Sequence, residues 1–299
     1  MSPQIAQPAP LSPPMFASLA AVFVLFWSTG FVAAKFGFPY AEPFTFLGTR
    51  FVIASLLLLA LCFALRARWP RRLRDYGHIV VAGLLVQSIY LVGVYYGIFL
   101  GVSTGIMALI VGLQPLITGA LVSPFLGESV SRRQWFGLAL GFGGLSLVVA
   151  EKIAFGEAVW FGYVLGFMGL LTITAGTLYQ KKFCADFDLR TTVTIQNVVS
   201  CVLMLALACL FETMEVSWTG EYVFALLWSA VALSVIAIML FYYIVARGAA
   251  TKVTSLIYLS PPTTAVMGWL VFDETLATLA LTGMVVAVVG VAMVSGERR

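Results

Sequence analysis

Ten long runs with almost no charged side chain divide this chain, and this pattern constrains its fold more than any other feature. An apolar α-helix needs about 20 residues to cross the roughly 30 Å hydrocarbon core of a bilayer. Ten such helices and their connections use up nearly all of the 299 residues. The pattern therefore predicts an all-α integral membrane protein with ten transmembrane helices, at residues 15–34, 43–65, 77–100, 103–126, 134–150, 158–180, 190–211, 222–246, 251–272 and 276–295.

Charged side chains gather in the connections, and their signs predict an orientation. Only 10% of the residues are charged, whereas soluble domains average about 25%. Lys and Arg favour cytoplasmic loops. With a cytoplasmic amino terminus, the inner connections hold fourteen of the 17 Lys and Arg residues, five of them at residues 66–74, and the outer ones hold only Lys35 and Lys152. We therefore expect a multi-pass protein of the inner (cytoplasmic) membrane with both termini in the cytoplasm.

The two halves of the chain repeat each other at an offset of 146 residues. Pro115 and Glu128 correspond to Pro261 and Glu274, since 261 − 115 = 274 − 128 = 146. Four further pairs keep this register: Tyr96 and Tyr242, Thr118 and Thr264, Gly137 and Gly283, and Gly144 and Gly290. Because each half holds five helices, an odd number, the second half must lie upside down. Inverted repeats are a device for alternating access in transporters.

The predicted organisation is a first five-helix repeat at residues 15–150 and a second, inverted five-helix repeat at residues 151–299. Residues 1–14 precede them. This stretch contains five prolines and neither Lys nor Arg, so it lacks the basic start of a secretory signal. We predict that it is a disordered cytoplasmic tail.

Several short motifs resemble the EamA-type exporters of the drug/metabolite transporter superfamily. They are WSTGFVAAK at residues 27–35, Pro43 with Arg50, and the two stretches from proline to glutamate. The resemblance covers about residues 16–295, and Gln196 departs from it where Arg50 would recur. It implies a similarity to bacterial exporters of amino acids, aromatic ones among them, and of related metabolites. It also implies that the helices at 134–150 and 276–295 pack together as a static scaffold.

Polar and aromatic side chains within the apolar runs are the candidates for a substrate site. Polar atoms are costly in lipid, so such side chains either line a cavity or bond one helix to another. For any single residue the second role is the stronger expectation. The predicted substrate-binding set is Trp27, Ser28, Gln87, Tyr90, Gln114, Thr174, Tyr179, Tyr242, Tyr258 and Ser260.

Pro115 and Pro261 are predicted hinges or kinks, because proline removes one helix hydrogen bond. Arg50 lies about 10 Å from the outer end of its helix at 1.5 Å per residue. It is a candidate for attracting a substrate carboxylate, and the alternatives are snorkelling to lipid headgroups or a hydrogen bond to a neighbouring helix. Glu128 and Glu274 fall at helix ends, where an acid can bind the backbone donors of the next helix.

Several classes of function are disfavoured. None of the ten predicted spans contains Asp or Glu, so a proton-carrying acid is missing, which favours a uniporter or coupling through other groups. Residues 101–105 match the nucleophile pattern G-x-S-x-G, but the single histidine, His78, is expected at the opposite membrane surface. No metal, cofactor or nucleic acid is expected, and the predicted partners are a small-molecule substrate and the bilayer.

We therefore expect a transporter that exports small organic solutes by alternating access, and not an enzyme. The alternatives are a facilitator or channel for small metabolites and, less favoured, a membrane enzyme acting on lipid-linked substrates. The sequence leaves the oligomeric state open and is compatible with a monomer.

The orientation can be tested by cysteine labelling in a background without the four native cysteines. We expect Arg71→Cys to react with a membrane-impermeant maleimide only after cells are opened, because it lies in the basic inner connection. Glu215→Cys, in the predicted outer connection, should react in intact cells. Labelling of Arg71→Cys in intact cells would show that the orientation is the opposite of the predicted one.

Overall fold

The computed structural model describes residues 11–102, 104–149, 157–272 and 278–295. Within these ranges the chain forms ten helical segments, several of which are interrupted. They are α1 (Pro13–Gly37), α2 (Pro43–Ala64), α3 (Leu73–Gly83) with η1 (Leu84–Ile89) and α4 (Tyr90–Phe99), α5 (Thr104–Val111) with α6 (Gln114–Leu126), α7 (Arg132–Val149), α8 (Glu157–Phe183), α9 (Leu189–Phe211), α10 (Gly220–Trp228) with η3 (Ser229–Ala237) and α11 (Ile238–Arg247), α12 (Ala250–Thr254) with η4 (Ser255–Leu259) and α13 (Ser260–Phe272), and α14 (Thr278–Ser295).

The ten predicted helices are all present, with ends that differ by a few residues. In the described ranges, six helices are by themselves long and apolar enough to cross a membrane. The third segment begins at Leu73 rather than at residue 77, and its first turn contains Asp75, an acid that is favourable near a helix N-terminus. Most of the predicted tail and the boundary at residues 150 and 151 lie outside the described residues. Pro13 and Pro14 already belong to α1.

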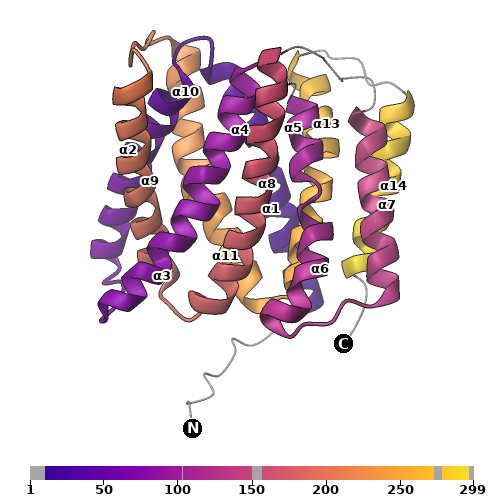
Figure 1. Cartoon of the computed structure of the whole chain (residues 1–299). Coiled ribbons are helices and arrows are strands. Elements are labelled where there is room, and N and C mark those ends of the chain that lie inside the picture. Colours follow the sequence, from indigo (N-terminus) through magenta and orange to yellow (C-terminus); the bar gives the residue numbers. More distant parts are fainter. Residues whose placement is uncertain (1–10, 103, 150–156, 273–277, 296–299) are drawn as a thin grey trace.

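Figure 1 shows the two halves in opposite orientations: α1 rises from the lower end, whereas α8, the first helix of the second half, descends from the upper end. The arginine-rich connection between α2 and α3 lies at the lower end, which we call the inner end. The opposite end is the outer end. The chain is thus built from two inverted repeats of five helices.

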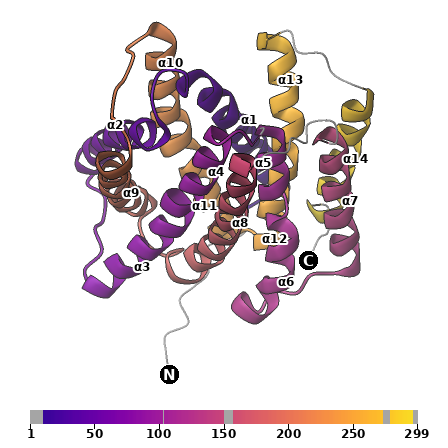
Figure 2. The same ribbon diagram turned by 45° about the horizontal axis from the view of Figure 1, so that its top comes forward.

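Two helix pairs close the sides of the bundle, and each joins one half to the other (Figures 1 and 2). On one side α2 packs along α9, and on the other α7 packs along α14. The second contact is the predicted scaffold. Its backbones touch, because a Cβ atom added to Gly144 would lie 2.4 Å from the Ala287 nitrogen and 2.6 Å from the Gly283 carbonyl oxygen. The other six segments lie between these pairs.

Acidic side chains tie the connections of the α2 and α9 pair. At the outer end, Glu42 accepts hydrogen bonds from the backbone nitrogen and the hydroxyl of Thr213, both at 2.8 Å. At the inner end, Asp188 accepts one from the Arg68 backbone nitrogen at 3.1 Å. Glu42 and Asp188 are equivalent at the repeat offset, since 188 − 42 = 146. Glu212 also binds the first turn of α2 through the Phe44 and Thr45 nitrogens, each at 2.7 Å.

Irregular turns also recur at equivalent positions in the two halves. Residues 84–89 and 229–237 are π-helical, and adding 146 to the first range gives 230–235. Each repeated proline follows a break: α5 and α6 are separated at Gly112 and Leu113, and the 3-10 turn η4 precedes α13. π-helical turns are rare and often occur at functional sites. The repeat therefore extends to departures from α-helical geometry.

The close contact of α7 with α14 predicts which glycines tolerate a side chain. Gly144→Val should destabilise the protein by about 1–3 kcal/mol, because the added atoms force two touching backbones apart. Gly143→Val is a matched control, since a Cβ at Gly143 meets nothing within 4 Å. Thermal unfolding in detergent should show a lower Tm for Gly144→Val alone. Equal Tm values for the two variants would argue against the contact.

Candidate functional site

A cavity lies in the outer half of the bundle between α1, α2, the helix formed by η1 and α4, and the helix formed by η3 and α11. We call it the central cavity. It encloses about 590 Å³ of empty space, including its open mouth. Its walls are apolar and aromatic with two polar side chains that are not aromatic, and they are formed by Trp27, Gly30, Arg50, Val86, Gln87, Tyr90, Leu91, Val94, Tyr95, Ile98, Leu233 and Ile238.

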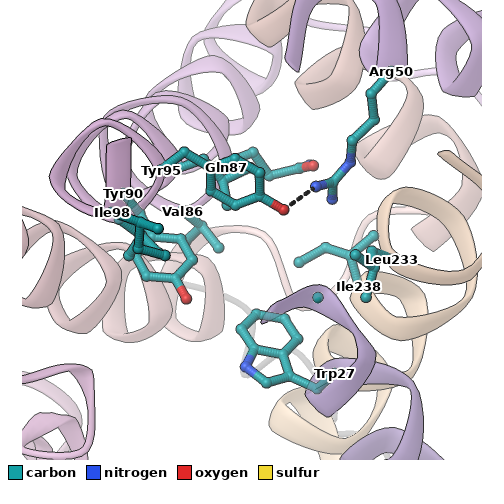
Figure 3. A pocket seen from close by; sticks show the side chains of 12 residues that line it. Trp27, Arg50, Val86, Gln87, Tyr90, Tyr95, Ile98, Leu233 and Ile238 are labelled. Carbon is teal, nitrogen blue, oxygen red and sulfur yellow. Dashed lines mark hydrogen bonds between the residues drawn. The ribbon is translucent and has the colours of Figure 1, made fainter. Parts of the chain in front are cut away.

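Arg50 contributes the positive charge of this cavity. Its Nε donates to the Ser234 hydroxyl at 2.7 Å and its Nη1 to the Tyr95 hydroxyl at 3.1 Å. The side chain is only 5% exposed and points into the bundle beside Tyr95 (Figure 3), so it does not snorkel to the headgroups. Both bonds join α2 to neighbouring helices. A hydrogen bond to a neighbouring helix was one of the alternatives predicted for Arg50.

Arg50 has no acidic partner within 4 Å among the described residues, whose ion pairs are formed by other groups. A buried charge without an opposite charge is costly. The guanidinium carries five N–H donors in a planar fork that fits a carboxylate. Two of these donors are used by Ser234 and Tyr95. The cavity wall therefore offers a preformed site for an anionic group.

Aromatic rings form the part of the cavity nearest α1. The Trp27 and Tyr90 rings are nearly parallel at 14°, with centroids 6.4 Å apart, and Trp27 also contacts Phe241 at 5.8 Å. Figure 3 shows Trp27 and Arg50 entering the same space from different helices, with Leu233 and Ile238 on one side and Tyr90 on the other. Gln87 and Tyr90, three residues apart, both line the cavity. Three of the ten predicted binding residues thus meet there, together with Arg50.

Four of the other predicted residues make contacts within or between helices away from this cavity. Ser28 donates to the Ser260 hydroxyl at 3.2 Å and joins α1 to α13. Gln114 donates to the Thr177 hydroxyl at 3.2 Å and joins α6 to α8. Thr174 donates to a carbonyl of its own helix. The contacts of Ser28 with Ser260 and of Gln114 with Thr177 are bonds between helices, the role that was expected for single members of the set, whereas the Thr174 bond stays within α8.

The remaining three tyrosines occupy separate places. The Tyr179 hydroxyl lies 2.7 Å from His78 Nδ1 near the inner end. Tyr258 is buried beside Gly141, where an added Cβ would lie 2.5 Å from the Tyr258 ring. Tyr242 lines a second cavity, at the inner end. The structure therefore does not gather the ten predicted residues into one site.

An ion pair at the inner end joins three helices. Glu128, just after α6, lies 2.5 Å from the Lys181 ammonium in the last turn of α8. Glu128 also accepts from the Ala250 nitrogen at 3.0 Å, and Lys181 donates to the Gly248 carbonyl at 2.5 Å. Glu128 thus binds the start of α12, not the next helix as predicted. That helix, α7, is instead preceded by a capping box, in which Ser131 and Gln134 bond to each other's backbone nitrogens.

Sequence reasoning missed several cavity residues because they are ordinary apolar or aromatic side chains. Tyr95, Leu233 and Ile238 line the cavity, yet similar residues occur on every span. The π-helical turns rotate the helix face, so a period of 3.6 residues does not identify this set. Gln196 lines neither this cavity nor the one at the inner end. The sequence could have marked it as a residue of interest, because it occupies the repeat position equivalent to Arg50. Glu274 lies outside the described residues.

Comparison with known proteins agrees with this architecture. A model of the EamA-like transporter family matches residues 15–150 and 160–296. The uncharacterized transporter YvbV of Bacillus subtilis (strain 168) is 27% identical over 288 residues, which cover 95% of this chain and 92% of YvbV. The uncharacterized inner membrane transporter YedA of Escherichia coli (strain K12) is 25% identical over 94% of this chain and 90% of its own length. One solved crystal structure shares the fold, with a TM-score of 0.79, 16% identity and coverage of 94% of this chain and 97% of that one.

The helix breaks predict a role for the prolines in turnover. Pro115→Ala and Pro261→Ala each allow a missing hydrogen bond to form, worth about 1 kcal/mol, and should slow transport in proteoliposomes about fivefold by stiffening the break. Pro124→Ala is the control, because Pro124 lies in the same helix as Pro115 but is exposed near its inner end. Unchanged turnover in both variants would show that the two prolines only shape their helices and do not act as hinges.

Proposed function

The chain belongs to the EamA-like transporter family and is a multi-pass membrane transporter, and we propose that it exports amino acids and related metabolites that carry a carboxylate. The observation that supports this substrate class best is Arg50, a buried guanidinium on the cavity wall without an acidic partner among the described residues. A substrate carboxylate would supply the missing negative charge through charge-assisted hydrogen bonds.

The remaining walls suit the rest of an amino acid. None of the residues that line the central cavity is acidic, so the ammonium group must be recognised in another way. The faces of Trp27 and Tyr90 attract cations, and the Gln87 amide supplies a further polar contact. Leu233, Ile238 and Val94 offer an apolar surface for an aliphatic or aromatic side chain.

The same composition bears on energy coupling. With no carboxyl group among the lining residues, the central cavity provides no acid that could carry a proton. We propose downhill export of a solute that accumulates in the cytoplasm. The position of the central cavity in the outer half favours a carrier with alternating access over an open channel. The ion pair of Glu128 and Lys181 holds α6, α8 and α12 together at the inner end.

The proposal predicts that transport depends on the substrate carboxylate. Proteoliposomes should show counterflow of L-phenylalanine, L-leucine and L-threonine, and much weaker counterflow of their amides, which lack the negative charge. Arg50→Gln should raise KM for the amino acids about 10- to 100-fold, because hydrogen bonds to charged groups are worth about 1.5–3 kcal/mol. A pH gradient should not drive accumulation.

Arg50→Lys and Arg133→Gln complete this experiment. Lysine keeps the charge but loses the planar fork, so we expect an intermediate KM. Arg133 is exposed at the inner end, so Arg133→Gln should behave like the wild type. Equal counterflow of amino acids and amides would show that the protein does not recognise the substrate carboxylate. No counterflow of any solute by correctly inserted protein would refute amino-acid transport.

A further inference from the structure

A second cavity, which we call the inner pocket, opens at the inner end between the end of α8, the start of α9 and the end of α11. It encloses about 840 Å³ of empty space, including its open mouth. Its polar lining differs from that of the central cavity, and consists chiefly of Gln180, Asp188, Arg190, Thr192, Tyr242 and Arg247.

The charges of this pocket sum to one positive charge. Arg190 and Asp188 form an ion pair at 2.6 Å, and hydrogen bonds from Arg190 lower the pKa of the Asp188 carboxyl to about 2. This pair is therefore neutral overall at physiological pH. Arg247 stacks on the Tyr243 ring at 3.8 Å and has no acidic partner within 4 Å among the described residues. The inner pocket, like the central cavity, thus carries an arginine available to an anion.

Two buried hydroxyl groups of the inner pocket lack a hydrogen-bond partner in the described part of the chain. They belong to Thr192 and Tyr242, which are 1% and 2% exposed. The Tyr242 hydroxyl faces the Gln196 amide without a hydrogen bond of normal geometry. Buried polar groups are almost always paired in folded proteins. Both residues line the inner pocket, so a polar ligand that entered it would lie beside these hydroxyl groups and supply their missing partners.

Three glutamines connect the inner pocket to the central cavity. Gln87, on the central cavity wall, donates to Gln196 at 3.3 Å, and Gln196 donates to Gln180, on the inner pocket wall, at 3.0 Å. They come from η1, α9 and α8. We call this line of buried side chains the glutamine bridge.

A bridge of neutral amides is a different barrier from an apolar plug. Each amide has donors and an acceptor that can be exchanged for those of a passing polar solute. The exchange leaves few groups unpaired, which keeps its free-energy cost low. The two cavities are therefore separated by groups that a polar solute can replace.

We propose that the inner pocket is the cytoplasmic loading site for the transported solute, and that the glutamine bridge is the partition that the solute crosses to reach the central cavity. This inference rests on the proposed function. The ligand class is a small carboxylate-bearing solute, whose carboxylate pairs with Arg247 and whose other polar groups bind Thr192 and Tyr242. Crossing requires the last turn of α8 to move, which separates Gln180 from Gln196 and Lys181 from Glu128.

The loading site is tested by measuring KM separately from each membrane face, with L-phenylalanine as the probe. Arg247→Gln should raise KM at least tenfold from the inner face and leave KM from the outer face within twofold. Arg50→Gln should raise KM from both faces, and Arg133→Gln should change neither. An Arg247→Gln effect that is equal on both faces, or absent, overturns the loading site while leaving the proposed function intact. Absence of flux in the wild type overturns both.

The same arginine chemistry also fits a lipid phosphate, so the measurement is repeated in two kinds of vesicle. One contains only phosphatidylcholine, and the other contains added phosphatidylglycerol. A carboxylate site predicts the same Arg247→Gln effect in both. An effect confined to the vesicles with phosphatidylglycerol assigns the pocket to a lipid headgroup and overturns the loading site.

The glutamine bridge is tested with Gln196→Met, which keeps a similar side-chain volume and removes the hydrogen bonds to Gln87 and Gln180. Turnover should fall at least tenfold in both directions, while KM from the inner face stays within twofold because the loading site is intact. The Tm in detergent shows whether the variant is folded. Wild-type turnover in a folded Gln196→Met protein would exclude the bridge from the pathway.

Discussion

A polar atom inside a bilayer must find its partner within the protein, because the surrounding hydrocarbon offers none. This constraint governs where the chain places its charged and polar groups. Among the described residues, acids lie in the connections or in the first turns of helices, and there Glu212 and Asp188 bind backbone nitrogens. Deeper in the bundle, neutral amides bond to one another across helices, as Gln87 and Gln196 do. Arg50 is the exception, and its buried charge dominates the chemistry of the central cavity.

The duplicated scaffold supports unequal chemistry in its two halves. Arg50 and Gln196 are equivalent at the repeat offset, and each bonds to the π-helical turn that lies opposite it, Arg50 to Ser234 and Gln196 to Gln87. In one half this contact contributes a cation to the central cavity, and in the other it forms part of a neutral partition. The geometry has been kept while the charge has changed. Symmetry of the backbone therefore does not imply a symmetric pathway.

The sequence predicted the features that depend on apolar length, which are the ten spans and the inverted halves. The resemblance to EamA-type exporters implied the contact of α7 with α14. The sequence did not separate cavity residues from packing residues, because Ser28 and Ser260 meet across 232 positions and nothing in their local sequence shows it. The π-helical turns were missed for a related reason, since they leave no distinctive residue pattern. The orientation and the substrate remain predictions.

The two side pairs of helices have a consequence for the biosynthesis of the protein. Both α2 with α9 and α7 with α14 join the first half of the chain to the second. The early helices thus enter the membrane before their main partners have been synthesised, and α7 has no lateral partner until α14 is made. Neither half contains its own lateral partners, so each half alone would expose the glycine-lined faces that the other covers. The contact of α7 with α14 forms only when α14 inserts, after both repeats have been synthesised.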